Sequence, residues 1–163
     1  MKNETIKKIV ISIFILLCIF LLDRISKILI LNILEETGQV DIYINSFLNF
    51  YLVWNKGIGF GLLSSEQDLF YNVVTTLIIL INFAIIYLLL KEKGLKYYFL
   101  IVILGGSLGN LFDRVYYRAV PDFFDLNYKG YHWFIFNVAD IFITIGIILL
   151  ILAELISYKK VNE

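Results

Sequence analysis

The sequence predicts an integral membrane protein, mainly α, with four transmembrane helices and a small extracytoplasmic β-cradle formed by the first outer loop. The 163 residues are 60% hydrophobic, and the mean hydropathy of +0.84 is well above that of soluble domains. Four long apolar runs recur along the chain, and a segment rich in β-branched and aromatic residues separates the first two. We therefore expect one membrane domain over residues 1–163.

The four apolar runs have the length of membrane spans, because about 20 mostly apolar residues cross a bilayer. They cover residues 9–34, 70–90, 97–112 and 136–157. The third run is the shortest, so we expect its helix to extend about one turn beyond one of these ends. The N-terminal pattern resembles a secretory signal, but no small-residue cleavage site follows it. We interpret this segment as a retained first span.

The lysines that flank the spans predict the orientation of the chain. They precede the first span, separate the second from the third and follow the fourth: Lys2, Lys7, Lys8, Lys91, Lys93, Lys96, Lys159 and Lys160. The positive-inside rule places all three groups in the cytoplasm. Both termini are then cytoplasmic, and residues 35–69 and 113–135 form outer loops. The net charge of zero gives no indication of a nucleic-acid partner.

The first outer loop contains two predicted strands. Residues 40–44, VDIYI, and residues 47–54, FLNFYLVW, are rich in β-branched and aromatic side chains. NKGIGFG, residues 55–61, supplies the glycines of a turn or bend. We expect these strands to form a small β-structure that rests on the outer face of the membrane.

Polar side chains from three spans fall at one level, near the outer ends of the predicted helices. They are Asp23, Lys27, Asn110, Asp113, Arg114, Asn137, Asp140 and Thr144. Ionisable groups at that depth normally face protein or a wet cavity rather than lipid. Asp23 and Lys27 lie four residues apart on one helix face, and we interpret them as part of a structural hydrogen-bond network. Gly105 and Gly109 form a small-xxx-small pair that lets another helix approach closely.

Two of the outer carboxylates are candidates for a catalytic pair. Asp140 begins the fourth span, and the second outer loop delivers either Asp122 or Asp125. Two neighbouring carboxyl groups do not both ionise readily, so one retains a proton. Such a pair provides a base that activates water and an acid that protonates a leaving amine, as in aspartic proteases. The residues alone leave the choice between Asp122 and Asp125 open.

Two other functions use the same carboxylates. A Mg²⁺-dependent lipid phosphotransferase would take oxygen ligands from the outer carboxylates Asp113, Asp122, Asp125 and Asp140. A proton-coupled carrier would use Asp23 and Asp140 as relay groups. The phosphotransferase lacks a repeated acidic motif on one helix. The carrier lacks internal repeats, and its ionisable groups would lie near the midplane rather than at one interface.

Five segments together resemble lipoprotein signal peptidase, also called signal peptidase II. They are LLDRISK (21–27), WNKGIGFG (54–61), GGSLGNLFDR (105–114), VPDFFD (120–125) and FNVAD (136–140). The resemblance covers the whole chain and includes the order and spacing of the segments. It implies a bacterial inner-membrane aspartic endopeptidase that needs no metal or organic cofactor. Its implied partners are membrane lipid and diacylglyceryl-modified prolipoproteins, which are cleaved before the lipidated cysteine. We expect a monomer.

The resemblance also implies roles for individual residues. Asp122 and Asp140 become the catalytic pair, and Asp125 then falls outside it. The positions that line or order the family's site are matched by Asp23, Lys27, Asn55, Gly57, Asn110, Arg114 and Asn137. The chain departs from the family pattern at Pro121, where an apolar β-branched residue is usual, and at Trp54, where a more polar residue is common. We expect Pro121 to stiffen the loop that carries Asp122.

Overall fold

The computed structural model describes residues 2–57, 68–129 and 131–162. The elements are α1 (Lys2–Thr37), β1 (Asp41–Asn45), β2 (Leu48–Asn55), α2 (Asp68–Lys91), α3 (Gly94–Tyr117), β3 (Val120–Tyr128), β4 (Tyr131–Phe136) and α4 (Val138–Asn162). Four helices in the described ranges are long and apolar enough to cross a membrane. The predicted number of four spans is confirmed. Helix α3 extends beyond residues 97–112 at both ends, and α4 begins at Val138, two residues after the predicted start of the fourth span. Residues 58–61 of the predicted glycine turn lie outside the described residues.

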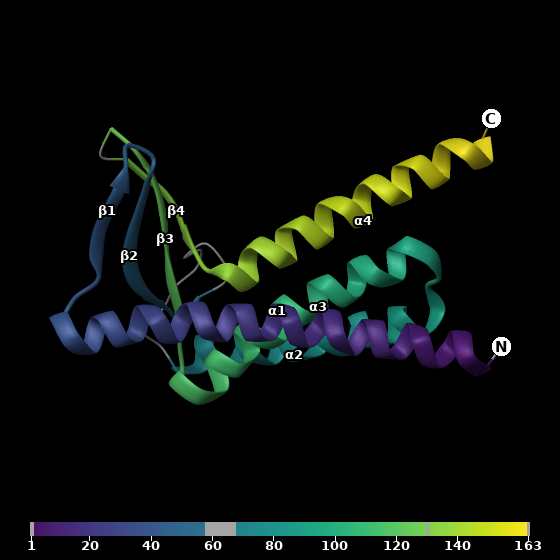
Figure 1. Ribbon diagram of the computed structural model, residues 1–163, viewed down its shortest axis with the longest axis horizontal. Helices are drawn as coiled ribbons and strands as arrows, with labels where there is room; N and C mark the ends of the chain where they lie inside the picture. Colours follow the sequence, from purple (N-terminus) through teal and green to yellow (C-terminus); the bar gives the residue numbers. More distant parts are fainter. Residues whose placement is uncertain (1, 58–67, 130, 163) are drawn as a thin grey trace.

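The sheet and the chain termini lie at opposite ends of the helices. Figure 1 shows both termini at one end and the four strands at the other, running across the direction of the helices. The α2–α3 connection lies at the end that holds the termini (Figure 1). We predicted that the three groups of lysines lie on the same side of the membrane. The arrangement of the chain agrees, because the segments that carry them lie at the same end of the helices.

The sheet contains two strands that the sequence analysis did not predict. The strands lie in the order β1-β2-β3-β4, and all neighbouring strands are antiparallel. The second outer connection contributes β3 and β4, which are half of the strands. The predicted small β-structure is confirmed, with β1 and β2 from the first outer loop as predicted and β3 and β4 added by the second connection. β3 includes Pro121, Asp122 and Asp125, which are residue types depleted in strands, and its burial does not alternate cleanly. Asp122 consequently lies in a strand opposite Val53 of β2 and not on a loop.

A small apolar core joins the sheet to the C-terminal end of α1. Ile30 of α1, Val40 before β1 and Phe123 of β3 form its buried centre, and Phe123 also makes edge-to-face contact with Phe50 of β2. The base of the sheet is therefore fixed on the first helix, close to the point where α4 begins.

Helix α3 is the centre of the bundle, because it contacts each of the other three helices. Of its most apolar stretch, 44% is buried, against 17% or less in the others. Its glycines allow these approaches. A Cβ atom on Gly105 or Gly109 would meet Ile19 or Asp23 of α1, which confirms the predicted small-xxx-small pair. A Cβ atom on Gly106 would lie 2.6 Å from the carbonyl oxygen of Ala139 in α4.

We predict that Gly106→Ala destabilises the protein by about 1–3 kcal/mol, the usual cost of overpacking, because the added methyl group meets backbone of α4. Unfolding by a denaturing detergent in mixed micelles measures the change. Gly105→Ala is the matched control, since its methyl group meets only the side chain of Ile19, at 3.1 Å, and that side chain can shift. Equal losses in the two variants would contradict the close packing of α3 on α4.

Candidate active site

The first turn of α4 places one of the two carboxylates. Asn137 precedes the helix, and its Oδ1 accepts a hydrogen bond from the backbone N–H of Asp140 (3.2 Å). In return, Asp140 Oδ2 accepts a hydrogen bond from the backbone N–H of Asn137 (3.1 Å). This reciprocal pattern is a capping box, which satisfies two backbone donors that a helix start leaves open. It also fixes the Asp140 carboxyl group at the level of the sheet base.

Asp122 faces the same asparagine from strand β3. Its Oδ1 accepts a hydrogen bond from Asn137 Nδ2 (2.6 Å), and its Oδ2 accepts one from Asn55 Nδ2 (2.8 Å) at the end of β2. The side chain of Asn137 thus caps α4 with its oxygen and binds Asp122 with its nitrogen. A single residue holds the carboxyl groups of Asp122 and Asp140 on either side of it.

A second asparagine connects Asp140 to helix α1. Asn110 of α3 donates from Nδ2 to Asp140 Oδ1 (2.8 Å), and its Oδ1 accepts a hydrogen bond from Lys27 Nζ (3.0 Å). Each of the four carboxyl oxygens of Asp122 and Asp140 therefore receives one N–H donor. All of these donors are neutral amides, so neither carboxylate contacts a cation through them.

The electrostatic setting keeps a proton on the pair. Burial first, and the negative charge of Asp140 second, raise the pKa of Asp122 to about 7, although its bonds to Asn55 and Asn137 act in the other direction. Two carboxyl groups that interact in this way lose their protons in two separate steps. A pair that holds one proton contains both an acid and a base, which is the state required for combined acid and base chemistry.

A buried cluster of four charges lies beside the pair. We call Asp23, Arg24, Lys27 and Asp113 the charge cluster; its two cations and two carboxylates balance. Lys27 Nζ lies 2.8 Å from Asp23 Oδ1 and 2.6 Å from Asp113 Oδ2. Arg24 lies 2.8 Å from Asp23 and 2.5 Å from Asp113. The predicted network around Asp23 and Lys27 is present, and Arg24 is a member that the sequence analysis missed. Its position one residue from Asp23 and three from Lys27 was the available signal.

The charge cluster also reaches α4. Asp23 Oδ1 accepts a hydrogen bond from the backbone N–H of Ala139 (3.1 Å), a donor in the first turn of α4. The absence of a side chain at Gly109 makes room for this carboxylate, because a Cβ atom there would lie 2.6 Å from Asp23 Oδ2. A carboxylate at the positive end of a helix is favourable. Helices α1, α3 and α4 are thereby joined directly next to Asp140.

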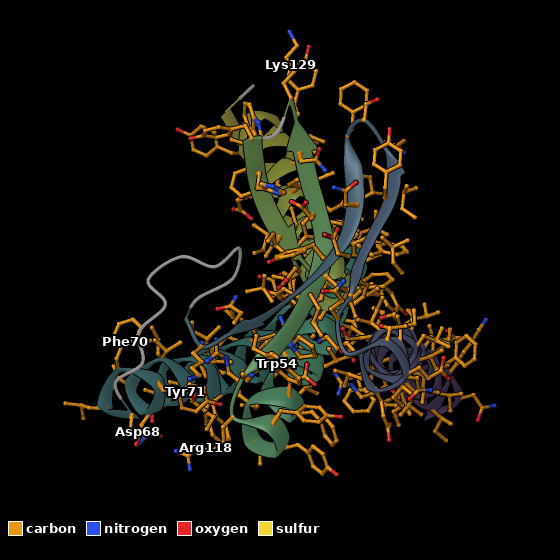
Figure 2. The ribbon with its side chains drawn as sticks, turned by 90° about the vertical axis from the view of Figure 1, so that its left-hand side faces the viewer. Trp54, Asp68, Phe70, Tyr71, Arg118 and Lys129 are labelled. Carbon is orange, nitrogen blue, oxygen red and sulfur yellow. The ribbon has the colours of Figure 1, made fainter. Side chains whose placement is uncertain are left out.

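Arg114 holds the backbone that follows β2. It donates from Nη2 to the carbonyl oxygen of Gly57, and the Gly57 N–H donates to Asn55 Oδ1 (2.8 Å). Because its oxygen is held in this way, Asn55 presents its nitrogen to Asp122. Tyr71 of α2 donates to the carbonyl oxygen of Arg114 (2.5 Å). Figure 2 shows Tyr71 and Trp54 near the base of the sheet, far from Lys129 at its tip.

Two other residues that the sequence analysis singled out lie apart from the pair. Asp125 is fully buried, but along β3 it falls on the face opposite to Asp122. Its Oδ2 lies 2.7 Å from Nδ1 of His132 in β4, so it belongs to a separate polar contact. Thr144 is exposed on α4. The structure brings together the other residues of the predicted site, with Asp122 rather than Asp125 facing Asn137.

Family comparison identifies the kind of protein that carries this arrangement. The family model described as signal peptidase (SPase) II matches residues 15–156. The chain belongs to this family. It is 50% identical to the lipoprotein signal peptidase of Pelagibacter ubique (strain HTCC1062), over 100% of this chain and 99% of the relative. It is 36% identical to the lipoprotein signal peptidase of Anaplasma phagocytophilum (strain HZ), over 96% and 99% of the two chains.

Solved structures agree with this assignment. A bacterial membrane enzyme determined by the in meso method at 2.3 Å resolution superposes with a TM-score of 0.75 and 31% identity, covering 91% of this chain and 90% of that one. A second, at 1.9 Å resolution, gives a TM-score of 0.68 and 32% identity, over 88% and 92%. The signal peptidase II family consists of membrane peptidases, so the chain is a multi-pass membrane enzyme. The phosphotransferase and carrier alternatives are not supported.

We predict that Lys27→Met destabilises the protein by about 3–5 kcal/mol, because it leaves the charge cluster with two buried carboxylates and one cation. Unfolding in mixed detergent micelles again provides the measurement. The matched control is Lys96→Met, which removes an ion pair with the 70% exposed side chain of Glu154 and should cost no more than about 1 kcal/mol. Similar losses in both variants would show that the charge cluster does not hold the helices together.

Proposed function

We propose that this enzyme removes the signal peptide from diacylglyceryl-modified prolipoproteins and cuts the bond before the lipidated cysteine. The observation that carries the proposal is the position of Asp122 and Asp140 on either side of Asn137. One carboxyl group comes from the sheet and the other from the start of a membrane helix. The names of the curated relatives, which are lipoprotein signal peptidases, support the assignment of the substrate.

In the proposed mechanism, Asp140 is the base and Asp122 carries the proton at rest. Asp140 takes a proton from a water molecule, and the water oxygen attacks the scissile carbonyl carbon. Asp122 donates a hydrogen bond to the carbonyl oxygen, on which negative charge develops. As the tetrahedral intermediate collapses and the C–N bond breaks, Asp140 passes the proton that it took from the water to the leaving amine of the cysteine, and Asp122 retains its own proton. Asn55, Asn110 and Asn137 keep the two carboxyl groups oriented while the protons move.

The lipid on the substrate explains why the pair lies at a membrane surface. We propose that the enzyme is a monomer in the bacterial inner membrane, with cytoplasmic termini and the carboxylates at the outer face. The lysines near the termini and in the α2–α3 connection support this orientation. The diacylglyceryl group then anchors the substrate in the outer leaflet at the depth of the pair. Each buried CH₂ group contributes about 0.8 kcal/mol to that anchoring.

Conversion of either carboxyl group to an amide tests the proposed pair. Asp122→Asn and Asp140→Asn should each lower the cleavage rate by about 10²–10⁴-fold, because each removes one partner of the acid–base chemistry. The assay is cleavage of a diacylated prolipoprotein by purified enzyme in detergent with EDTA present. Both variants are first checked for folding by their unfolding in denaturing detergent.

Asp125→Asn is the control for this experiment, since it makes the same change on the other face of β3 and should retain most of the activity. Cleavage that survives in Asp122→Asn or Asp140→Asn would remove that residue from the chemistry. Loss of cleavage in folded Asp125→Asn would mean that the wrong carboxylate of β3 has been chosen.

The pH dependence tests which proton matters. Because the pKa of Asp122 is raised from its ordinary value to about 7, the protonated acid is present below that pH and is lost as the pH rises through it. We predict that kcat/KM falls above about pH 7 with the loss of one proton, and that folding stability also decreases as the pH approaches 7 from below. Initial rates with a lipopeptide that lacks groups titrating near neutral pH provide the measurement. A rate that stays constant into the alkaline range would contradict Asp122 as the acid.

A further inference from the structure

A hollow of about 720 Å³ lies at the end of the molecule that is remote from the carboxylate pair. Its walls come from the end of α2, the first turn of α3 and the last turns of α4. Figure 1 shows that α4 diverges from the other helices toward its C-terminus. Ala153, Ile156 and Ser157, which line the hollow, belong to this part of α4. Its volume falls within the range of ordinary small-molecule sites.

The polar part of the hollow is mainly cationic. Lys91, Lys93 and Lys96 line it together with Glu92. Lys96 Nζ lies 2.5 Å from Glu154 Oε2, and Lys91 Nζ lies 4.4 Å from the ring centre of Tyr87. These three lysines, counted together with Glu92 of the lining and Glu154, the partner of Lys96, leave an excess of one positive charge. A ligand that completes this balance would be an anion.

The remaining wall of the hollow is mainly apolar, with Leu95, Ala153 and Ile156 beside the hydroxyl group of Ser157. Leu95 is 70% exposed and Ile156 is 60% exposed, and both line the hollow beside the lysines. These residues lie at the ends of helices that span the membrane, where the hydrocarbon region meets the headgroups. An exposed apolar wall next to lysines matches a molecule with an acyl chain next to a negatively charged group.

We propose that this hollow binds an anionic phospholipid from the membrane leaflet opposite the carboxylate pair. The lysines would contact its phosphate, and Leu95 and Ile156 would contact the first carbons of its acyl chains. Juxtamembrane lysines attract anionic lipids with about 1 kcal/mol each, which is about fivefold in affinity. The bound lipid would join the α2–α3 connection to the diverging end of α4 and so stabilise the fold. The proposal depends on the membrane-spanning helices and not on the proposed chemistry.

Thermal unfolding in a neutral detergent tests the proposal. Phosphatidylglycerol is titrated into the purified enzyme, and phosphatidylcholine with the same acyl chains is titrated in parallel. We expect the unfolding temperature to rise with phosphatidylglycerol and not with phosphatidylcholine. In Lys91→Gln/Lys93→Gln, the phosphatidylglycerol concentration that gives half of the effect should rise about 25-fold, since two lysines are removed. Both side chains are exposed, so this variant should fold.

The control variant is Lys7→Gln/Lys8→Gln, which loses the same charge near the same end of the helices but outside the hollow. It should retain the response to phosphatidylglycerol. Equal stabilisation by the two lipids, or equal weakening in the two variants, would overturn the proposal in favour of a nonspecific effect. Stabilisation by inorganic phosphate alone, to the same extent as by phosphatidylglycerol, would overturn it in favour of a free-anion site.

Discussion

The balance of buried charge between α1 and α3 is the constraint on which the site depends. A charge that leaves water at membrane depth is tolerated only when an opposite charge and hydrogen bonds compensate it. The charge cluster satisfies this condition with two cations and two carboxylates, and Asp23 uses a further lone pair to cap α4 through Ala139. The relative positions of three helices are therefore fixed by the same contacts. Asp140 takes its place one residue beyond that cap.

Neutral amides separate the charge cluster from the carboxylate pair. Lys27 donates a hydrogen bond to Asn110, and Asn110 in turn donates one to Asp140, so an amide lies between the lysine and this carboxyl group. A lysine in direct contact with the pair would favour ionisation of both carboxyl groups and would remove the proton that acid catalysis needs. An asparagine can orient a carboxyl group with its nitrogen while its oxygen accepts a bond from the lysine. The arrangement supplies firm hydrogen bonds to Asp122 and Asp140 without supplying a countercharge.

The parts of the structure that sequence reasoning reached are those set by local pattern. The length of the apolar runs predicted the number of spans, and the i, i+4 spacing of Asp23 and Lys27 predicted their contact. The strand β3 was missed because proline and aspartates obscure its β-propensity and because it is buried on both faces near Asp122. The contact of Arg24 with Asp113 joins two helices far apart in sequence, and no local pattern encodes it. The residues alone could not decide between Asp122 and Asp125. That decision depends on which face of β3 each side chain occupies, and β3 had not been predicted.

Within the described residues, the contacts that join the sheet to the helices lie at its base, and this has a mechanical consequence. Its base is held by the apolar core around Phe123, whereas its outer end carries exposed residues such as Tyr131 and Lys129 (Figure 2). The sheet can therefore pivot about its base, which lies beside Asn137. A small rotation about this base would move the tip through a long arc and displace Asp122 very little. We therefore expect contacts made by the tip to leave the position of Asp122 nearly unchanged.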